Sequence, residues 1–223
     1  MSRSTRAPPH VPSAAVPGSE SYAALLDYRR QVHALYSTVR RLAAKDPKIA
    51  HEHWRRVRDR LFGQHPQSAI APEDRTGFTG LRYYPYDRRY RFSAPLIEDL
   101  GERFEIRTSA GEAMWLRPIG RIEIPLGRLP VFWIDVYGGG IFVPFRDATS
   151  GNATYGGGRY LIDTVKGADL GSNERGDLII DLNFAYNPSC HYHHRWSCPL
   201  AGPESRIDQR VEAGEMTWEG AGH

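Results

Sequence analysis

The sequence predicts a mainly β protein, an antiparallel β-sandwich or a partly closed barrel, preceded by an N-terminal helical hairpin. Beyond Pro72, short runs rich in Tyr, Phe, Ile, Val and Trp alternate with turns of Gly, Pro, Asp and Ser, which is the pattern of consecutive strands. No helical stretch separates these runs, so the crossover connections that a parallel sheet needs are not expected. Before Pro72, apolar residues recur every three or four positions and predict helices.

The chain of 223 residues is long for one average domain and short for two, and we expect one folded unit. The expected divisions are a flexible tail at 1–19, a helical hairpin at 20–63 and a β domain at 64–223, with 20–223 folding together. The tail is predicted from its Pro, Ser and Ala content.

Two helices make up the expected hairpin. The first should run from Ser19 to about Ala44, because its apolar residues form one helical face. The second should start after Asp46, a good N-cap, with Pro47 at the first helical position, and end at Gly63.

The expected strands are short and are separated by turn sequences. They lie in GLRYYPY, RYRFSA, RFEIRTS, MWLRPIGRIEIP, PVFWIDVY, GIFVPF, GRYLIDTVKG, DLIIDLNFAY and QRVEAGEM. The turns SAGE, PLGRLP, YGGG and GSNERGD recur at the short intervals of an antiparallel meander.

Composition excludes some classes of protein. A hydrophobic fraction of 40% with 25% charged residues is typical of a soluble globular chain. The first twenty residues lack the apolar core of a secretory signal, and no apolar run approaches the roughly 18 residues that span a bilayer, so we expect a cytoplasmic protein without membrane contact. The net charge of +3 is mild and does not favour nucleic acid as a partner.

The segment NPSCHYHHRWSCPL, residues 187–200, holds both cysteines of the chain and three of its nine histidines. The Cys-x7-Cys spacing is not that of a zinc finger, and no second Cys pair exists. Four interpretations stay open: a packed loop with two thiols, a zinc site with Cys190, Cys198 and His193 as ligands, a disulfide, or a nucleophilic Cys with a His base.

Two strands carry polar side chains whose role is ambiguous. Alternation over 178–186 places Asp181 and Asn183 on one face, which is either solvated, the favoured interpretation, or the floor of a pocket. Over 158–166, Arg159 and Asp163 share a face, where they either pair with each other or offer groups to a ligand.

Glycine-rich and arginine-rich runs add little specificity. YGGG (137–140) and YGGGRY (155–160) lack the context of phosphate-binding loops and predict tight turns or bulges. RYYPYDRRYRF (82–92) has the composition of a stacking and phosphate-binding surface, but Asp87 interrupts it and no recognised motif is present.

Several long strings resemble a known family. They are RLFGQHPQS (60–68), FTGLRYYPYD (78–87), GGGIFVPFRDATSGNATYGGGRYLIDTVKGADLG (138–171), LIIDLNFAYNPSCHYHHRWSCPL (178–200) and AGE (213–215). Together they resemble the uncharacterised bacterial and archaeal family called domain of unknown function 1684, over roughly 50–216. The resemblance implies no activity.

The chain departs from the family pattern at His191 to His194 and at Gly202 to Ser205. The histidines are therefore local to this chain and its near relatives. What the resemblance implies as shared is the set Cys190, Tyr192, Trp196, Cys198 and Glu204.

Two functions are weighed. The favoured one is a small-molecule-binding protein or an enzyme, with hydrolytic or transfer chemistry on an anionic substrate, in a site among loops 138–159 and 183–204. The expected catalytic residues are Cys190, Cys198 and Asp163, and the expected ligand-binding residues are Arg146, Arg159, Asp169, Asn183, Tyr186, Asn187 and Glu204. The alternative is a noncatalytic interaction module with a structural Cys/His loop.

Overall fold

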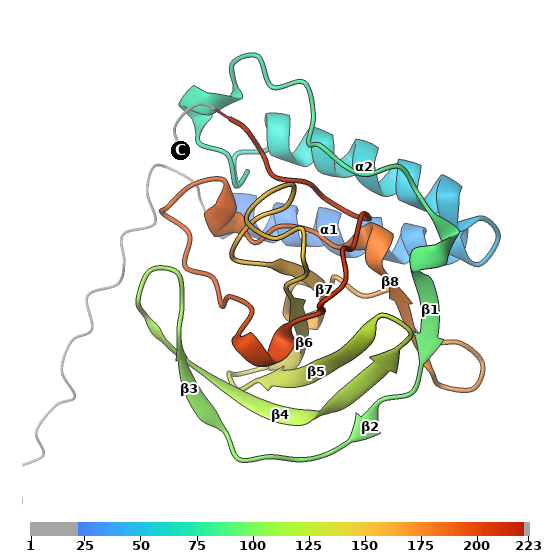
Figure 1. Ribbon diagram of the computed structural model, residues 1–223. Helices are drawn as coiled ribbons and strands as arrows, with labels where there is room; N and C mark the ends of the chain where they lie inside the picture. The colour runs from blue at the N-terminus through green and yellow to red at the C-terminus, as the bar shows by residue number, and fades with distance from the viewer. Residues whose placement is uncertain (1–21, 221–223) are drawn as a thin grey trace, which may run out of the picture.

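The computed structural model describes residues 22–220. The expected tail at 1–19 lies outside the described residues. The two predicted helices are confirmed as α1 (Tyr22–Ala43) and α2 (Pro47–Gln64), which lie side by side (Figure 1). The carboxylate of Asp46 caps α2 by accepting hydrogen bonds from the backbone N–H groups of Lys48 (2.8 Å) and Ile49 (3.3 Å).

The rest of the described chain is mainly β, as predicted. Its strands are β1 (Arg91–Ala94), β2 (Ile97–Glu98), β3 (Phe104–Arg107), β4 (Ala113–Ile124), β5 (Gly127–Ile134), β6 (Gly140–Phe145), β7 (Arg159–Asp163) and β8 (Leu178–Asp181). A six-stranded sheet has the order β2-β4-β5-β6-β7, with β3 also on β4, and β1 pairs with β8. All these pairings are antiparallel.

The large sheet curves without closing, and the helices lie on the side toward which it curves, with C-terminal segments between the two layers (Figure 1). One apolar core joins the helices to one end of the sheet, and a second lies between the other end and β8. None of the described helices is long and apolar enough to cross a membrane.

Several strand predictions were wrong in part, among them GRYLIDTVKG, where the strand ends at Asp163 and Thr164–Lys166 form a 3₁₀ helix. GLRYYPY and QRVEAGEM lie beside each other but share only the single bridge Tyr83–Glu215, because Gly214 has φ +76° and interrupts the extended backbone. The strand expected at 178–186 ends at Asp181, whose carboxylate accepts a hydrogen bond from the Asn183 N–H (3.1 Å) and turns the chain into a short 3₁₀ helix.

A cluster of buried polar groups joins the helices to the C-terminal segment. We call Arg58, Tyr83, Asn187, Tyr192 and Glu215 the Glu215 cluster. Glu215 is fully buried and pairs with Arg58 at 2.6 Å, and it also accepts hydrogen bonds from the Tyr192 hydroxyl and from the Asn187 N–H (3.0 Å). Burial raises the pKa of Glu215, and the Arg58 guanidinium opposes that rise.

His51 on α2 is buried among aromatic rings. The ring centroids of Trp54, Tyr86 and Phe184 lie 5.7, 5.6 and 5.3 Å from that of His51. Burial, helped by the positive charge of Arg55, lowers the pKa of His51 to about 4.

Arg58→Met should be strongly destabilising, because it leaves the Glu215 carboxylate buried without its cation. The expected loss is about 3–5 kcal/mol in the free energy of unfolding, measured by urea denaturation. The control, Arg103→Met, breaks a half-exposed surface pair with Asp135 (3.5 Å) and should cost about 1 kcal/mol or less. Equal losses of unfolding free energy in the two variants would contradict the importance of the buried Arg58–Glu215 pair.

Stability should fall at acid pH in a way that depends on His51. Its pKa is depressed from 6.5 to about 4, so its contribution is full above pH 6.5 and is lost as the pH falls toward 4. Between pH 7.5 and 5 the wild type should lose about 2 kcal/mol more than His51→Gln. Parallel pH profiles for the two proteins would show that His51 titrates normally.

Candidate functional site

The cysteine loop, residues 187–200, is fixed to the helical layer by side chains along its length. Tyr192 donates to Glu215 within the Glu215 cluster. The Trp196 indole N–H donates to the Ala69 carbonyl (2.9 Å), and the Arg195 guanidinium donates to the Ser68 carbonyl (2.8 Å), just after α2. The loop is therefore held firmly by the segment that follows α2.

The end of the loop that carries Cys198 is bonded to the β3–β4 turn. The Ser109 N–H donates to the Cys198 carbonyl (2.8 Å), and the Cys198 N–H donates to the Ser109 hydroxyl (3.0 Å). The hydroxyls of Thr108 and Ser197 lie 2.6 Å apart. This double attachment sets the backbone position of Cys198.

Both cysteines are free thiols and differ in exposure. Cys190 is half-buried, at the middle of a short 3₁₀ helix, Ser189–His191, whereas Cys198 is buried with 3% of its surface exposed. Hydrogen bonding from Cys198 lowers the pKa of Cys190 to about 6, and burial opposes this effect. The pKa of Cys198 is raised, first by the hydrogen bond to Cys190 and then by burial. The two sulfurs thus share one proton near neutral pH, with the thiolate on Cys190.

Tyr155 completes the surroundings of Cys190. Its hydroxyl lies 3.9 Å from the Cys190 sulfur, and its ring centroid lies 4.4 Å from that of His191. Burial, and next the charge of Cys190, raises the pKa of Tyr155 to about 12, so the hydroxyl keeps its proton and can donate to the thiolate. The Nε2 atom of His191 accepts a hydrogen bond from the Trp218 N–H (2.8 Å) and is engaged there.

Lys166 supplies a positive charge on the Cys198 side, where it counters the rise in the pKa of that thiol. Its ammonium lies 3.5 Å from the Asp163 carboxylate and 5.5 Å from the centre of the Tyr160 ring. Asp163 is buried and also accepts a hydrogen bond from the Lys166 N–H (3.2 Å). Through these two contacts, Asp163 positions the side chain and the backbone of Lys166.

Arg146 lies near Tyr155, whose pKa its charge lowers. Its Nε atom is buried without a hydrogen-bond partner among the described residues. The side chain therefore has donors to offer to an anionic group.

Arg159 is placed in the core, and it pairs with Asp147 and not with Asp163, which was one of the two alternatives for this face. It is 1% exposed and binds Asp147 (3.2 Å) together with the carbonyls of Val211 (3.1 Å) and Ala213. Its guanidinium thus ties the C-terminal segment to β7.

The face of Asp181 and Asn183 is buried, so the solvated face that we expected was wrong. Asn183 bonds both backbone groups of Asp87, accepting from its N–H (2.9 Å) and donating to its carbonyl (2.8 Å). Asp181 pairs with Arg91 at 2.9 Å. Asp181 therefore joins β8 to β1, and Asn183 joins the turn after β8 to the segment before β1.

The remaining expected ligand-binding residues lie apart from the thiols or within the core. The Asp169 carboxylate accepts from the Gly171 N–H (2.9 Å), and the Asn187 amide donates to the Met216 carbonyl (2.8 Å). Tyr186 is buried, and its hydroxyl has no hydrogen-bond partner among the described residues.

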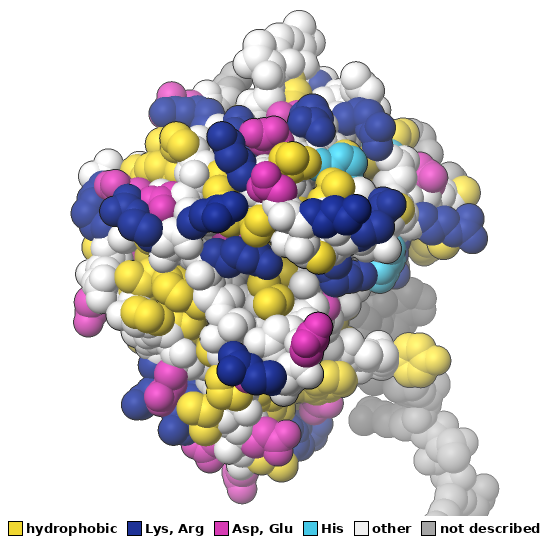
Figure 2. Space-filling model, turned by 90° about the vertical axis from the view of Figure 1, so that its right-hand side faces the viewer, with side chains coloured by type: hydrophobic (Ala, Val, Ile, Leu, Met, Phe, Trp, Pro, Cys, Tyr) yellow, Lys and Arg dark blue, Asp and Glu magenta, His cyan; other side chains and the backbone are white. Residues whose placement is uncertain are grey.

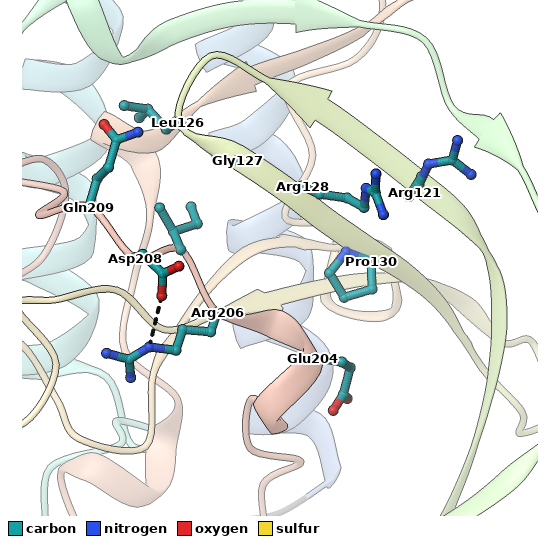
Figure 3. A pocket seen from close by; sticks show the side chains of 10 residues that line it. Arg121, Leu126, Gly127, Arg128, Pro130, Glu204, Arg206, Asp208 and Gln209 are labelled. Carbon is teal, nitrogen blue, oxygen red and sulfur yellow. Dashed lines mark hydrogen bonds and ion pairs between the residues drawn. The ribbon is translucent and has the colours of Figure 1, made fainter.

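Glu204 lines a shallow groove of about 600 Å³ (Figure 3). The guanidinium groups of this groove are balanced by carboxylates: Arg121 and Arg128 both pair with Glu123, and Arg206 pairs with Asp208 (3.4 Å). The groove therefore offers no concentrated charge to a ligand.

No group of three or more His, Cys, Asp and Glu side chains between residues 22 and 220 is arranged to hold a metal ion. The His193 ring stacks on His194, with centroids 4.2 Å apart, and its Nδ1 accepts from the Arg195 N–H (3.1 Å). Among the described residues, Cys190 and Cys198 therefore come together without His193 as a third candidate ligand.

Tyr155, Ser109 and Lys166 were missed by the sequence analysis. Lys166 and Tyr155 lie in segments whose sequence pattern points to other residues, and Ser109 lies in a segment that the sequence predicts only as a turn. Tyr155 contacts Cys190 across 35 positions and Ser109 contacts Cys198 across 89, and spacing alone does not reveal such contacts.

Comparison with known proteins assigns the family. The model of a family described as "Protein of unknown function (DUF1684)" matches residues 76–216. The chain belongs to this family. The solution NMR structure of the uncharacterized protein from gene locus rrnAC0354 of Haloarcula marismortui is 30% identical to it, with a TM-score of 0.52. That match covers 78% of this chain and 96% of the other, and no curated protein matches.

The lowered pKa of Cys190 in this DUF1684 protein leads to a prediction about the reactivity of that thiol. The rate of Cys190 alkylation by iodoacetamide should rise with a midpoint near pH 6, because the lowered pKa exposes the thiolate above that pH. In Cys198→Ala, which removes the main hydrogen-bond donor, the midpoint should move toward the ordinary value of about 8.5.

The measurement is peptide mass spectrometry of the alkylated chain across a pH series. The Cys190→Ala/Cys198→Ala variant has no thiol and gives the background. A wild-type midpoint above pH 8 would contradict the arrangement.

Proposed function

We propose that this DUF1684 protein is a thiol-dependent redox protein, in which Cys190 and Cys198 cycle between dithiol and disulfide. The observation that carries the proposal is the asymmetry of the pair: a half-buried Cys190 with a lowered pKa beside a buried Cys198 that keeps its proton. An accessible thiolate attacks, and a buried thiol within reach of it resolves the product.

The reaction class is thiol–disulfide exchange. The Cys190 thiolate attacks one sulfur of a disulfide R–S–S–R′, forming the mixed disulfide Cys190–S–S–R and releasing R′–S⁻. The Cys198 thiol then gives its proton to solvent, and its sulfur attacks that of Cys190, releasing R–S⁻ and closing the Cys190–Cys198 disulfide. Two electrons have passed to the substrate, and an external dithiol reductant restores the starting state.

The surrounding charges favour an anionic small-molecule substrate. Arg146 and Lys166 lie on the Tyr155 and Cys198 sides of the pair, and the Arg146 Nε atom has no hydrogen-bond partner among the described residues. The proposal agrees with the sequence-based expectation of an anionic substrate. It differs in the reaction, which is thiol–disulfide exchange and not hydrolysis. The cysteines would begin as thiols in a reducing compartment such as the cytoplasm.

The test uses an anionic aromatic disulfide, 5,5′-dithiobis(2-nitrobenzoate), on fully reduced protein. The wild type should release two coloured thiolates per chain and end with an internal disulfide, seen as the loss of two hydrogen atoms in the intact mass. The Cys198→Ala variant should release one coloured thiolate per chain and retain the other half of the probe as a mixed disulfide on Cys190. Arg146→Gln should slow the anionic probe several-fold while leaving the neutral 4,4′-dithiodipyridine unaffected.

Cys190→Ala, which keeps the buried thiol, should react at least tenfold more slowly than Cys198→Ala. If the wild type retains stable adducts on both cysteines, or does not react, the proposal fails and the loop is structural, as in the alternative of a noncatalytic interaction module.

A further inference from the structure

Charge is distributed unevenly between the two layers. Residues 22–64, which include both helices, contain ten Lys and Arg against four Asp and Glu, a net charge of +6. Residues 65–223 contain 17 Lys and Arg against 21 Asp and Glu, a net charge of −4. The mild overall charge of +3 conceals this separation.

Part of the helical charge forms one surface, which we call the helical basic surface: Arg41, His53, Arg56 and Arg60. His53, Arg56 and Arg60 are spaced along one face of α2 by three and four positions. The three arginines are exposed. The pKa of His53 is lowered, first by partial burial and then by the charges of Arg56, Arg60 and Arg41.

These arginines have no anionic partner within the part of the chain that the structure describes. Three of the four arginines of segment 82–92 are different: Arg82 pairs with Glu219, Arg89 with Asp87, and Arg91 with Asp181. The segment that suggested phosphate binding from its composition is therefore largely neutralised, whereas the helical basic surface is not.

The apolar face of α2 is not available to a membrane. Ala50, Trp54 and Leu61 are buried in the core, so the helix has no apolar side chains of that face to insert between lipids. Figure 2 looks onto the side of the molecule that carries the α1–α2 connection, and Lys and Arg side chains gather over its upper half beside His. On this face, Lys and Arg side chains are interspersed with acidic, apolar and uncharged ones.

We propose that the helical basic surface binds the sugar–phosphate backbone of a nucleic acid. Arginine matches phosphate with a planar fork of donors, and three arginines without internal partners lie on the surface. The seven-residue interval from His53 to Arg60 spans about 10 Å of helix, close to the rise of three base pairs. Backbone contacts of this kind do not read sequence, so binding should be sequence-independent.

The experiment is fluorescence anisotropy of labelled 20-nucleotide duplex DNA and single-stranded RNA, titrated with the full chain between 50 and 200 mM salt. The wild type should bind at least one of them with an affinity that falls steeply with salt. Arg41→Gln/Arg56→Gln/Arg60→Gln should bind about tenfold or more weakly at 50 mM salt, and its slope of log K against log salt should be smaller by about three.

The matched control is Arg103→Gln/Arg121→Gln/Arg210→Gln, which removes the same charge from surface arginines that are ion-paired. This control should keep most of the wild-type affinity for nucleic acid and most of the wild-type slope of log K against log salt. An equal loss in both triple variants, or no binding to either nucleic acid at 100 μM protein, overturns the proposal. Binding to anionic phosphatidylserine vesicles without binding to nucleic acid also overturns it and assigns the surface to membranes.

Discussion

The buried ion pair between Arg58 and Glu215 is the interaction on which the rest of the structure depends. It joins α2 to a segment 157 positions away along the chain. Two buried charges lose their hydration, and they are tolerated only where further hydrogen bonds satisfy them. Tyr83 accepts from Arg58 at 3.0 Å, while Tyr192 and Asn187 donate to Glu215, so both charges are satisfied.

This cluster also determines where the cysteine loop lies. Asn187 and Tyr192 belong to the first half of the loop, on either side of Cys190. Both donate hydrogen bonds to the Glu215 carboxylate. The β3–β4 turn holds Cys198 independently through Ser109. Two separate attachments thus bring one cysteine of each half together, and they leave Cys190 half-buried and Cys198 buried.

Much of the fold could be predicted from sequence because its signals are local. Apolar spacing and the Asp46-Pro47 cap define α2, and runs of β-branched and aromatic residues define the sheet. The site was only partly predictable. Cys190 and Cys198 were recognised by type, but the burial of Arg159 and Asn183 follows from partners distant in sequence, Val211 and Asp87. Polar residues on a strand look alike whether they face water or a buried partner.

The central claim is that the Glu215 cluster positions a reactive thiol pair. The most direct test is the rate of Cys190 alkylation at pH 7 in Tyr192→Phe, which removes one hydroxyl and its hydrogen bond to Glu215 while keeping the ring that packs on Phe62 at 4.8 Å. We predict a rate several-fold below that of the wild type, in protein that is still folded by circular dichroism, because the loop no longer holds Cys190 against Cys198. A rate equal to that of the wild type would contradict the claim and separate the cluster from the chemistry of the thiols.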